Sequence, residues 1–109
     1  MGYVGSALVT DNGNIFTGIN IDLFCGIGFC AEHSAVADMV KAGETRILKI
    51  VATTARRRIL PPCGRCRELL YQIDQSNLAT EIVVGRKRRR KLRDLLPDNW
   101  QKHFGKALH

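Results

Sequence analysis

Hydrophobic and polar positions along the chain change between two periods, one typical of β-strands and the other of α-helices. Residues 3–10 and 15–20 are strand candidates, and the Asp11-Asn12-Gly13 sequence between them is a turn signal. These two segments are predicted to pair as an antiparallel hairpin. Residues 22–29 contain two glycines and show no clear period, so we interpret them as a loop that delivers Cys30.

Two segments carry apolar residues at helical spacing. Residues 31–42 form one apolar stripe with Gly43 as a stop signal, and residues 64–75 form another after the Pro61-Pro62 pair. The stripe residues are Ala35, Val36, Met39 and Val40 in the first segment, and Leu69, Leu70 and Ile73 in the second. Each stripe is expected to face the core.

The remaining apolar runs complete an alternating order of elements. Residues 47–54 are so rich in Ile, Val and Thr that we expect a central strand covered on both faces. Residues 81–85 are the next strand candidate, and residues 92–96 suggest a brief helix ended by Pro97. The order predicts the α/β class, as a three-layer α/β/α domain with one mixed sheet of about five strands between helices.

Length and composition fit one domain, residues 1–109, because 45% hydrophobic content is ample for a single core. Uncharged stretches such as residues 23–31 are far shorter than the roughly 20 apolar residues that a membrane span needs. The N-terminus lacks the basic start and apolar run of a signal peptide. We therefore expect a cytoplasmic protein with no membrane partner.

The net charge of +7 is concentrated in two basic clusters, Arg56-Arg57-Arg58 and the run from Arg86 to Lys91. Such clusters bind phosphates or nucleic acid. They also occur on solvated edge strands and loops, where like charges discourage edge-to-edge pairing. We favour this second interpretation because no base-stacking aromatic residues are interleaved with the charges. Nucleic-acid binding through the second cluster remains the alternative.

Candidate chemistry is concentrated in two motifs, Cys30-Ala31-Glu32 and Pro62-Cys63-Gly64-Arg65-Cys66. The spacing of Cys63 and Cys66 at the start of a helix puts both sulfurs on one face. With Cys30 they offer three thiolate ligands, which leave a fourth position for water in a tetrahedral zinc site. A Cys-x-x-Cys motif without secretory features favours metal binding over disulfide formation.

Glu32 follows two residues after a ligand, too near to share the tetrahedron but well placed to reach a metal-bound water. We interpret it as a proton shuttle, because displacing an amine from an aromatic ring needs a proton on the ring nitrogen and another on the leaving group. Zinc with three thiolates carries a net negative charge, so positive compensation is needed nearby. The local candidates are Arg65, Arg67 and His33.

At these residues the sequence resembles the cytidine deaminase superfamily, whose signature pairs Cys/His-x-Glu with a later Pro-Cys-x-x-Cys. The segments that follow the family's order are residues 4–8, 18–20, 30–33, 62–67 and 95–97, so the resemblance covers nearly the whole chain. Cysteine as the first ligand and the small size resemble the free nucleoside deaminases and the blasticidin S deaminases. The helix that usually precedes the first strand in this family has no expected counterpart within residues 1–3.

The resemblance implies zinc-dependent hydrolytic deamination of cytidine or deoxycytidine, with release of ammonia, in pyrimidine salvage. Cys30, Cys63 and Cys66 would hold Zn2+, and Glu32 would be the catalytic acid and base. Asn20 and Asp22 occupy the positions where nucleoside deaminases hold the ribose with an Asn-x-Glu pair, and the main-chain N–H near Ala31 would orient water and base.

Three alternative hypotheses accompany the cytidine deaminase prediction. Asp22 and the short loop after it motivate a blasticidin S-type aminonucleoside as the substrate. The basic clusters motivate a nucleic-acid-binding or editing protein. A purely structural zinc module is the third, although such sites usually take four protein ligands. The resemblance also implies a homo-oligomer, a tetramer, in which residues 100–104 are the candidate segment for reaching a neighbouring site.

Overall fold

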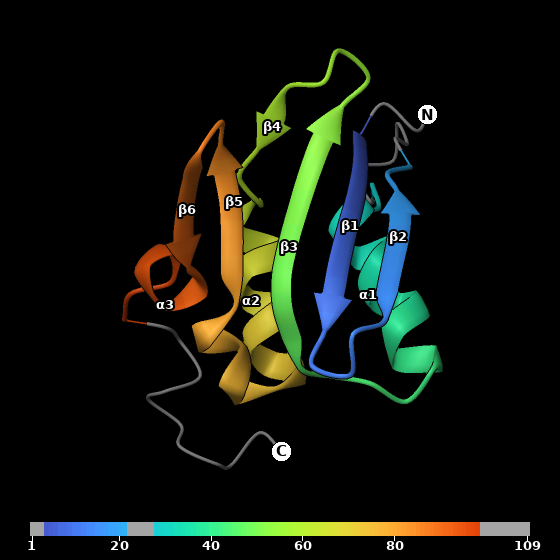
Figure 1. The fold of residues 1–109 in the computed structure, drawn as a ribbon, viewed down its shortest axis with the longest axis vertical. Helices are drawn as coiled ribbons and strands as arrows, with labels where there is room; N and C mark the ends of the chain where they lie inside the picture. The colour runs from blue at the N-terminus through green and yellow to red at the C-terminus, as the bar shows by residue number, and fades with distance from the viewer. Residues whose placement is uncertain (1–3, 22–27, 99–109) are drawn as a thin grey trace.

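A computed structural model describes residues 4–21 and 28–98 of the chain (Figure 1). In chain order the elements are β1 (Val4–Thr10), β2 (Ile15–Ile19), α1 (Ala31–Lys41), β3 (Ile47–Thr54), β4 (Ile59–Leu60), α2 (Gly64–Ile73), the 3-10 helix η1 (Gln75–Ala79), β5 (Glu81–Gly85), β6 (Arg88–Lys91) and α3 (Leu92–Leu95).

One mixed sheet of six strands runs in the order β2-β1-β3-β5-β6, with β4 paired to β3 beside this path. β1 is antiparallel to β2 and β3, β3 is parallel to β5, and β5 is antiparallel to β6. The α/β class, the first hairpin and the central position of β3 are thereby confirmed. The sheet has one strand more than the roughly five expected, because a two-residue strand such as β4 is too short to show a period.

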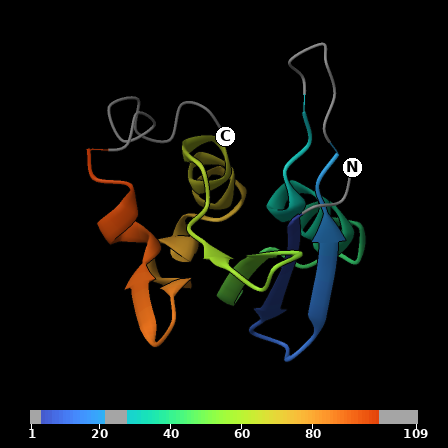
Figure 2. The same cartoon turned by 90° about the horizontal axis from the view of Figure 1, so that it is seen from above.

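The helices α1 and α2 both lie on one face of the sheet, behind it in Figure 1 and on one side of it in Figure 2. The described residues therefore supply two of the three expected layers. On the opposite face of the edge strand β2, Ile15 is 70% exposed and Ile19 is 58% exposed. β3 is thus covered on one face by described elements, where its sequence predicted cover on both.

The core lies between the sheet and these two helices. Its buried residues are Leu8, Ala35, Val36, Met39, Ile47, Ile50, Leu70, Tyr71, Ile82 and Leu92, with Leu69 and Ile73 partly buried against them. Both predicted helical stripes are confirmed except at Val40, which is 46% exposed. A neighbour in sequence is turned by about 100° around a helix, so Val40 lies beyond the narrow face that meets the sheet. No helix among these described residues is long and apolar enough to cross a membrane.

A buried side chain, Asn77 of η1, fixes the end of α2 against the sheet. Its oxygen accepts a hydrogen bond from the Ile47 N–H at 2.8 Å. Its amide nitrogen donates to the carbonyls of Thr45 at 2.9 Å and Leu70 at 3.0 Å. Because a buried amide without partners is costly, this satisfied set specifies one arrangement of α2, η1 and β3.

Gly18 of β2 lets α1 approach the sheet closely. A Cβ atom at this position would lie 2.4 Å from the Ala35 nitrogen and 2.5 Å from the Ser34 Cβ, so only a hydrogen atom fits. Ser34 and Ala35 belong to the first half of α1, which also carries Glu32. The absence of a side chain at Gly18 therefore sets where this part of α1 lies.

We expect Gly18→Ala to destabilise the protein by about 1–3 kcal/mol, because the new methyl group forces α1 away from β2. Gly5→Ala is the matched control, since a Cβ there meets only the Gly18 carbonyl oxygen at 3.9 Å. Urea unfolding of both variants measures the difference. Equal free energies of unfolding for the two variants would contradict the close contact.

Candidate active site

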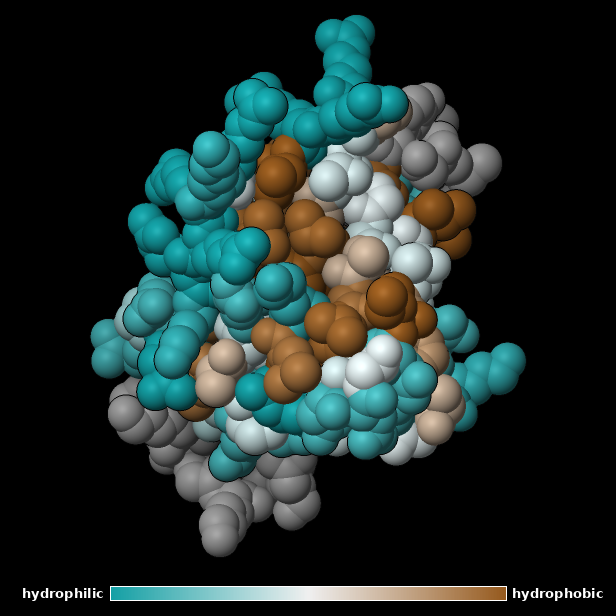
Figure 3. All heavy atoms as spheres, in the orientation of Figure 1, coloured by the Kyte–Doolittle hydropathy of each residue, from teal (hydrophilic) through white to brown (hydrophobic). Residues whose placement is uncertain are grey.

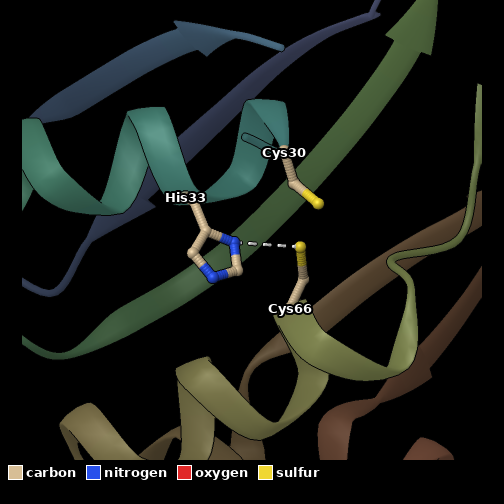
Figure 4. Close-up of side chains that lie close together, drawn as sticks. All are labelled: Cys30, His33 and Cys66. Carbon is tan, nitrogen blue, oxygen red and sulfur yellow. Dashed lines mark hydrogen bonds between the residues drawn. The ribbon is translucent and has the colours of Figure 1, made fainter. Parts of the chain in front are cut away.

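Two helices begin with a cysteine and meet at their N-termini. Cys30 is the N-cap residue of α1 and Cys63 is the N-cap residue of α2, and neither side chain makes a capping hydrogen bond. The third residue of each helix, His33 in α1 and Cys66 in α2, lies on the same side as its N-cap residue. Figure 4 shows the side chains of Cys30, His33 and Cys66 pointing toward one another from the two helices.

The sulfur atoms are spaced as zinc ligands are. Cys63 Sγ lies 3.7 Å from Cys30 Sγ and 3.5 Å from Cys66 Sγ. Ligand atoms of Cys30, His33 and Cys66 all lie within 4.8 Å of one another. Zinc–sulfur bonds of about 2.3 Å in a tetrahedron place two sulfurs about 3.8 Å apart. The three predicted cysteines therefore come together, and their donor atoms fit a zinc ion.

The environment of these thiols opposes ionising all of them without a cation. Burial, followed by the negative charge of Glu32, raises the pKa of Cys66. Burial also raises the pKa of Cys30. Burial acts in the same direction on Cys63, but hydrogen bonds, among them those from the backbone N–H groups of Cys66 and Arg65, outweigh it and lower the pKa of Cys63. Metal binding must therefore displace thiol protons, which makes it depend on pH.

Glu32 is the second residue of α1 and is only 6% exposed. Burial raises the pKa of its carboxyl group, and the hydrogen bond from its own backbone N–H offsets part of that rise. A carboxyl group whose pKa is raised toward neutrality accepts and returns a proton more readily than an exposed one. The predicted position of Glu32 beside the thiols is thus matched by an environment suited to proton transfer.

A cavity of about 370 Å³ opens beside these groups. Its walls include Asn20, Cys30, Ala31, Glu32 and Cys63, so the end of β2 and the starts of α1 and α2 contribute polar groups to one space. The side-chain oxygen of Asn20 accepts a hydrogen bond from the Val4 N–H at 2.9 Å, which fixes the amide at the rim. Asp22, the other predicted sugar contact, lies outside the described residues.

The three predicted sources of positive charge differ in what they do. Arg65 lines the cavity and donates to the Gly28 carbonyl at 2.9 Å, which ties α2 to the segment before α1. Arg67 donates to the carbonyls of Pro62 at 2.8 Å and Leu95 at 3.1 Å, so it braces the loop ahead of α2. Burial and the charge of Arg65 lower the pKa of His33, which leaves its ring largely neutral at pH 7.

His33, the third of these candidates for positive charge, contacts a thiol: its Nδ1 atom lies 3.3 Å from Cys66 Sγ. Its ring also contacts Phe29 edge-on, with ring centroids 5.9 Å apart. The signal for this position was the Cys-x-x-His spacing of Cys30 and His33, which matches the Cys-x-x-Cys spacing in the other helix.

Comparisons with known proteins agree with this geometry. Residues 2–82 match the family model described as the cytidine and deoxycytidylate deaminase zinc-binding region. A cytidine deaminase of Mycobacterium tuberculosis is 36% identical over 96 residues, covering 87% of this chain and 70% of that protein. A blasticidin-S deaminase of Bacillus cereus is 27% identical over 104 residues, covering 87% of this chain and 74% of that protein.

Solved structures show the same fold. The crystal structure of cytidine deaminase from Mycobacterium tuberculosis aligns with a TM-score of 0.80 at 34% identity, covering 89% of this chain and 77% of that one. That of cytidine deaminase from Mycobacterium leprae aligns with a TM-score of 0.78 at 30% identity, covering 87% and 78% of the two chains. The resemblance seen in the motifs is thereby confirmed.

We expect Cys63→Ser to weaken zinc binding by at least about 100-fold, because Cys63 is adjacent to both other sulfurs. His33→Gln is the matched comparison, and its zinc affinity is expected to stay within about tenfold of the parent protein. Competition with a chelator followed by elemental analysis measures both. If the His33 variant lost zinc as completely as the Cys63 variant, His33 would be a ligand.

Proposed function

Since this chain belongs to the cytidine and deoxycytidylate deaminase family, a family of zinc-dependent hydrolytic deaminases, we propose that it converts free cytidine or deoxycytidine to the uracil nucleoside and ammonia. The observation that carries this proposal is the buried carboxyl group of Glu32 beside three clustered thiols, two of which, Cys30 and Cys63, line the same cavity as Glu32. One domain spanning residues 1–109 would perform the reaction.

Each residue has a separate role in this proposal. Cys30, Cys63 and Cys66 would hold the zinc ion, which when bound supplies Lewis acidity that lowers the pKa of a water molecule. Glu32 would accept a proton from that water and donate one to the ring nitrogen of cytosine. It would finally carry a proton to the exocyclic amine, which leaves as ammonia.

The cavity supplies the contacts that would orient a nucleoside. Ala31 is the first residue of α1, where main-chain N–H groups lack partners within the helix and can meet a polar ligand. Asn20 is held at the rim by the Val4 N–H and is proposed to contact the sugar, together with Asp22. Val4, Phe29 and Leu60 give the same cavity apolar walls against which a flat ring can pack.

A blasticidin S-type aminonucleoside is the second substrate candidate within the same chemistry. Its support is the match to a blasticidin-S deaminase over most of both chains. The matches to cytidine deaminases at 36% identity favour the simpler nucleosides. Rates measured side by side on cytidine, deoxycytidine and blasticidin S separate these substrates.

A closed structural zinc site is the second candidate function, and one observation favours it. The Nδ1 atom of His33 lies near Cys66 Sγ and within reach of a common metal, so a fourth protein ligand is at hand. Structural zinc sites take four protein ligands, whereas catalytic sites keep one position open. X-ray absorption at the zinc edge before and after His33→Gln tests this, because loss of a nitrogen ligand would favour the structural site.

We also propose that the chain assembles as a homo-oligomer, a tetramer. Figure 3 shows apolar side chains gathered on the sheet face that α1 and α2 leave open. Ile15 and Ile19, both more than half exposed, lie on this face of β2. Clustered exposed apolar residues of this kind mark interaction surfaces. Residues 100–104, predicted to reach a neighbouring site, lie outside the described residues.

A cytoplasmic location in pyrimidine salvage is proposed with the activity. Its support is that Cys30, Cys63 and Cys66 are free thiols. Reduced cysteines of this kind persist in reducing compartments.

Glu32→Gln is expected to lower kcat for cytidine by at least about 100-fold while the zinc content stays at the parental level, because the amide cannot transfer the protons. Glu68→Gln on α2 is the control, since Glu68 accepts a hydrogen bond from Gln72 on the same helix and does not line the cavity. Ammonia release and the ultraviolet change report turnover. Normal turnover in the Glu32 variant would rule out its proposed role.

Replacing Ile15 and Ile19 by lysine is expected to shift the oligomer toward smaller species, because charged side chains oppose burial of this face. Light scattering coupled to size-exclusion chromatography gives the mass of each species. Val40→Lys, at an apolar residue of α1 that is 46% exposed, is the control and is expected to leave the mass unchanged. A parent protein that is monomeric at all concentrations would contradict the assembly.

A further inference from the structure

The two basic clusters, separated in sequence, meet at one edge of the sheet. The turn between β3 and β4 carries Arg57 and Arg58, and the turn between β5 and β6 begins at Arg86. These three arginines, with Ile59 and Gly85, line a cavity of about 490 Å³. In Figure 1 both turns lie at the same end of the sheet, and Figure 3 shows hydrophilic side chains gathered there.

No acidic group among the described residues neutralises these arginines. The ion pairs found there join Glu81 to Lys49 and to Arg89, and neither involves Arg57, Arg58 or Arg86. No carboxylate lines the cavity. Three guanidinium groups around one hollow repel one another, so an anion placed between them would be favoured.

The backbone beneath the first cluster is held in place while the side chains remain exposed. The Thr54 N–H donates to the Arg58 carbonyl at 2.9 Å, and the Arg57 N–H donates to the Thr54 carbonyl at 2.9 Å. The Arg58 N–H donates to the Thr54 hydroxyl at 3.1 Å. The turn is therefore ordered by its own hydrogen bonds, so its arginine side chains are not needed to build it.

Each of the two turns also places a basic residue where glycine would be less strained. Arg57 has φ 61° and Lys87 has φ 58°, both in the left-handed region that residues with a Cβ adopt at a cost. Strain of this kind at a charged, exposed position is consistent with a role for the side chain. Each turn thus carries a basic side chain on a backbone conformation that costs free energy.

We propose that Arg57, Arg58 and Arg86 form a binding site for an oligophosphate group, carried by inorganic tripolyphosphate or by a nucleoside triphosphate. Guanidinium groups bind phosphate oxygens through paired hydrogen bonds, and a concave site presents several of them to one compact anion. The cavity has no aromatic lining, which disfavours stacking of exposed bases and hence a single-stranded nucleic acid.

This site is separate from the proposed deaminase cavity, and its occupation goes beyond the proposed function. Ile59 lines the basic cavity, whereas the next residue of β4, Leu60, lines the deaminase cavity. The strand β4 therefore forms a shared wall. Binding is measured without turnover, so its failure and the failure of the deaminase proposal are distinguishable.

The test is calorimetric titration of the zinc-loaded full chain with tripolyphosphate and, separately, with ATP. Replacing Arg57, Arg58 and Arg86 together by glutamine is expected to weaken tripolyphosphate binding by at least about 30-fold, since charge-assisted hydrogen bonds are lost. The matched control replaces Lys41, Lys49 and Arg93 by glutamine, which removes the same charge elsewhere, and is expected to change binding by less than about threefold. Equal affinities in the two variants would overturn the site.

A second variant, Arg57→Gly, separates binding from folding. It removes one guanidinium and relieves the left-handed strain, so the melting temperature is expected to stay level or rise while binding weakens about tenfold. Unchanged binding would overturn the role of Arg57. Affinity for tripolyphosphate equal to that for ATP indicates recognition of the phosphate chain alone, whereas tighter ATP binding indicates a nucleotide source.

Single-stranded DNA is the competing ligand in the same experiment. The proposal expects a 20-nucleotide strand to bind no more tightly than tripolyphosphate. Tighter binding of the strand, with an affinity that falls steeply as salt is raised, would replace the oligophosphate site by a nucleic-acid surface.

Discussion

The structure depends on one electrostatic constraint: three thiols and a carboxyl group share the space where two helices begin. Burial opposes the charged forms of Cys30, Cys66 and Glu32. The helix N-termini offer partial positive charge, which is far smaller than the negative charge of several thiolates. A divalent cation resolves the conflict, because it stabilises the thiolates and gives the carboxyl group a polarised water to act on. Folding and metal binding are therefore linked in this protein.

Contacts elsewhere in the fold hold the N-termini of α1 and α2 next to each other. Gly18 lets α1 lie close against β2, and the buried amide of Asn77 fixes the end of α2 against β3. Arg65 and Arg67 then tie α2 to the segments before α1 and after β6 through carbonyl groups. Gly18 thus positions α1, and Asn77 positions the end of α2, so both act on the helices that begin at the cysteines.

Periodicity and motif spacing predicted most of the elements and the residues at the centre of the site. They predicted the hairpin, both long helices, the central strand and the meeting of Cys30 with Cys63 and Cys66, because each depends on local pattern or on ligand chemistry. They could not predict which face of β3 is covered, since apolarity indicates burial but not the covering partner. The two-residue β4 has no period, and the contact of His33 with Cys66 arises only when separate helices meet.

The strand β4, which the sequence pattern did not predict, lies between the two cavities. Consecutive residues of β4 line the two cavities: Ile59 lines the one with the uncompensated arginines, and Leu60 lines the one with Cys30, Cys63 and Glu32. No described residue lines both cavities, so the arginines of one can be replaced without changing a wall of the other, and the two activities can be tested independently in one protein.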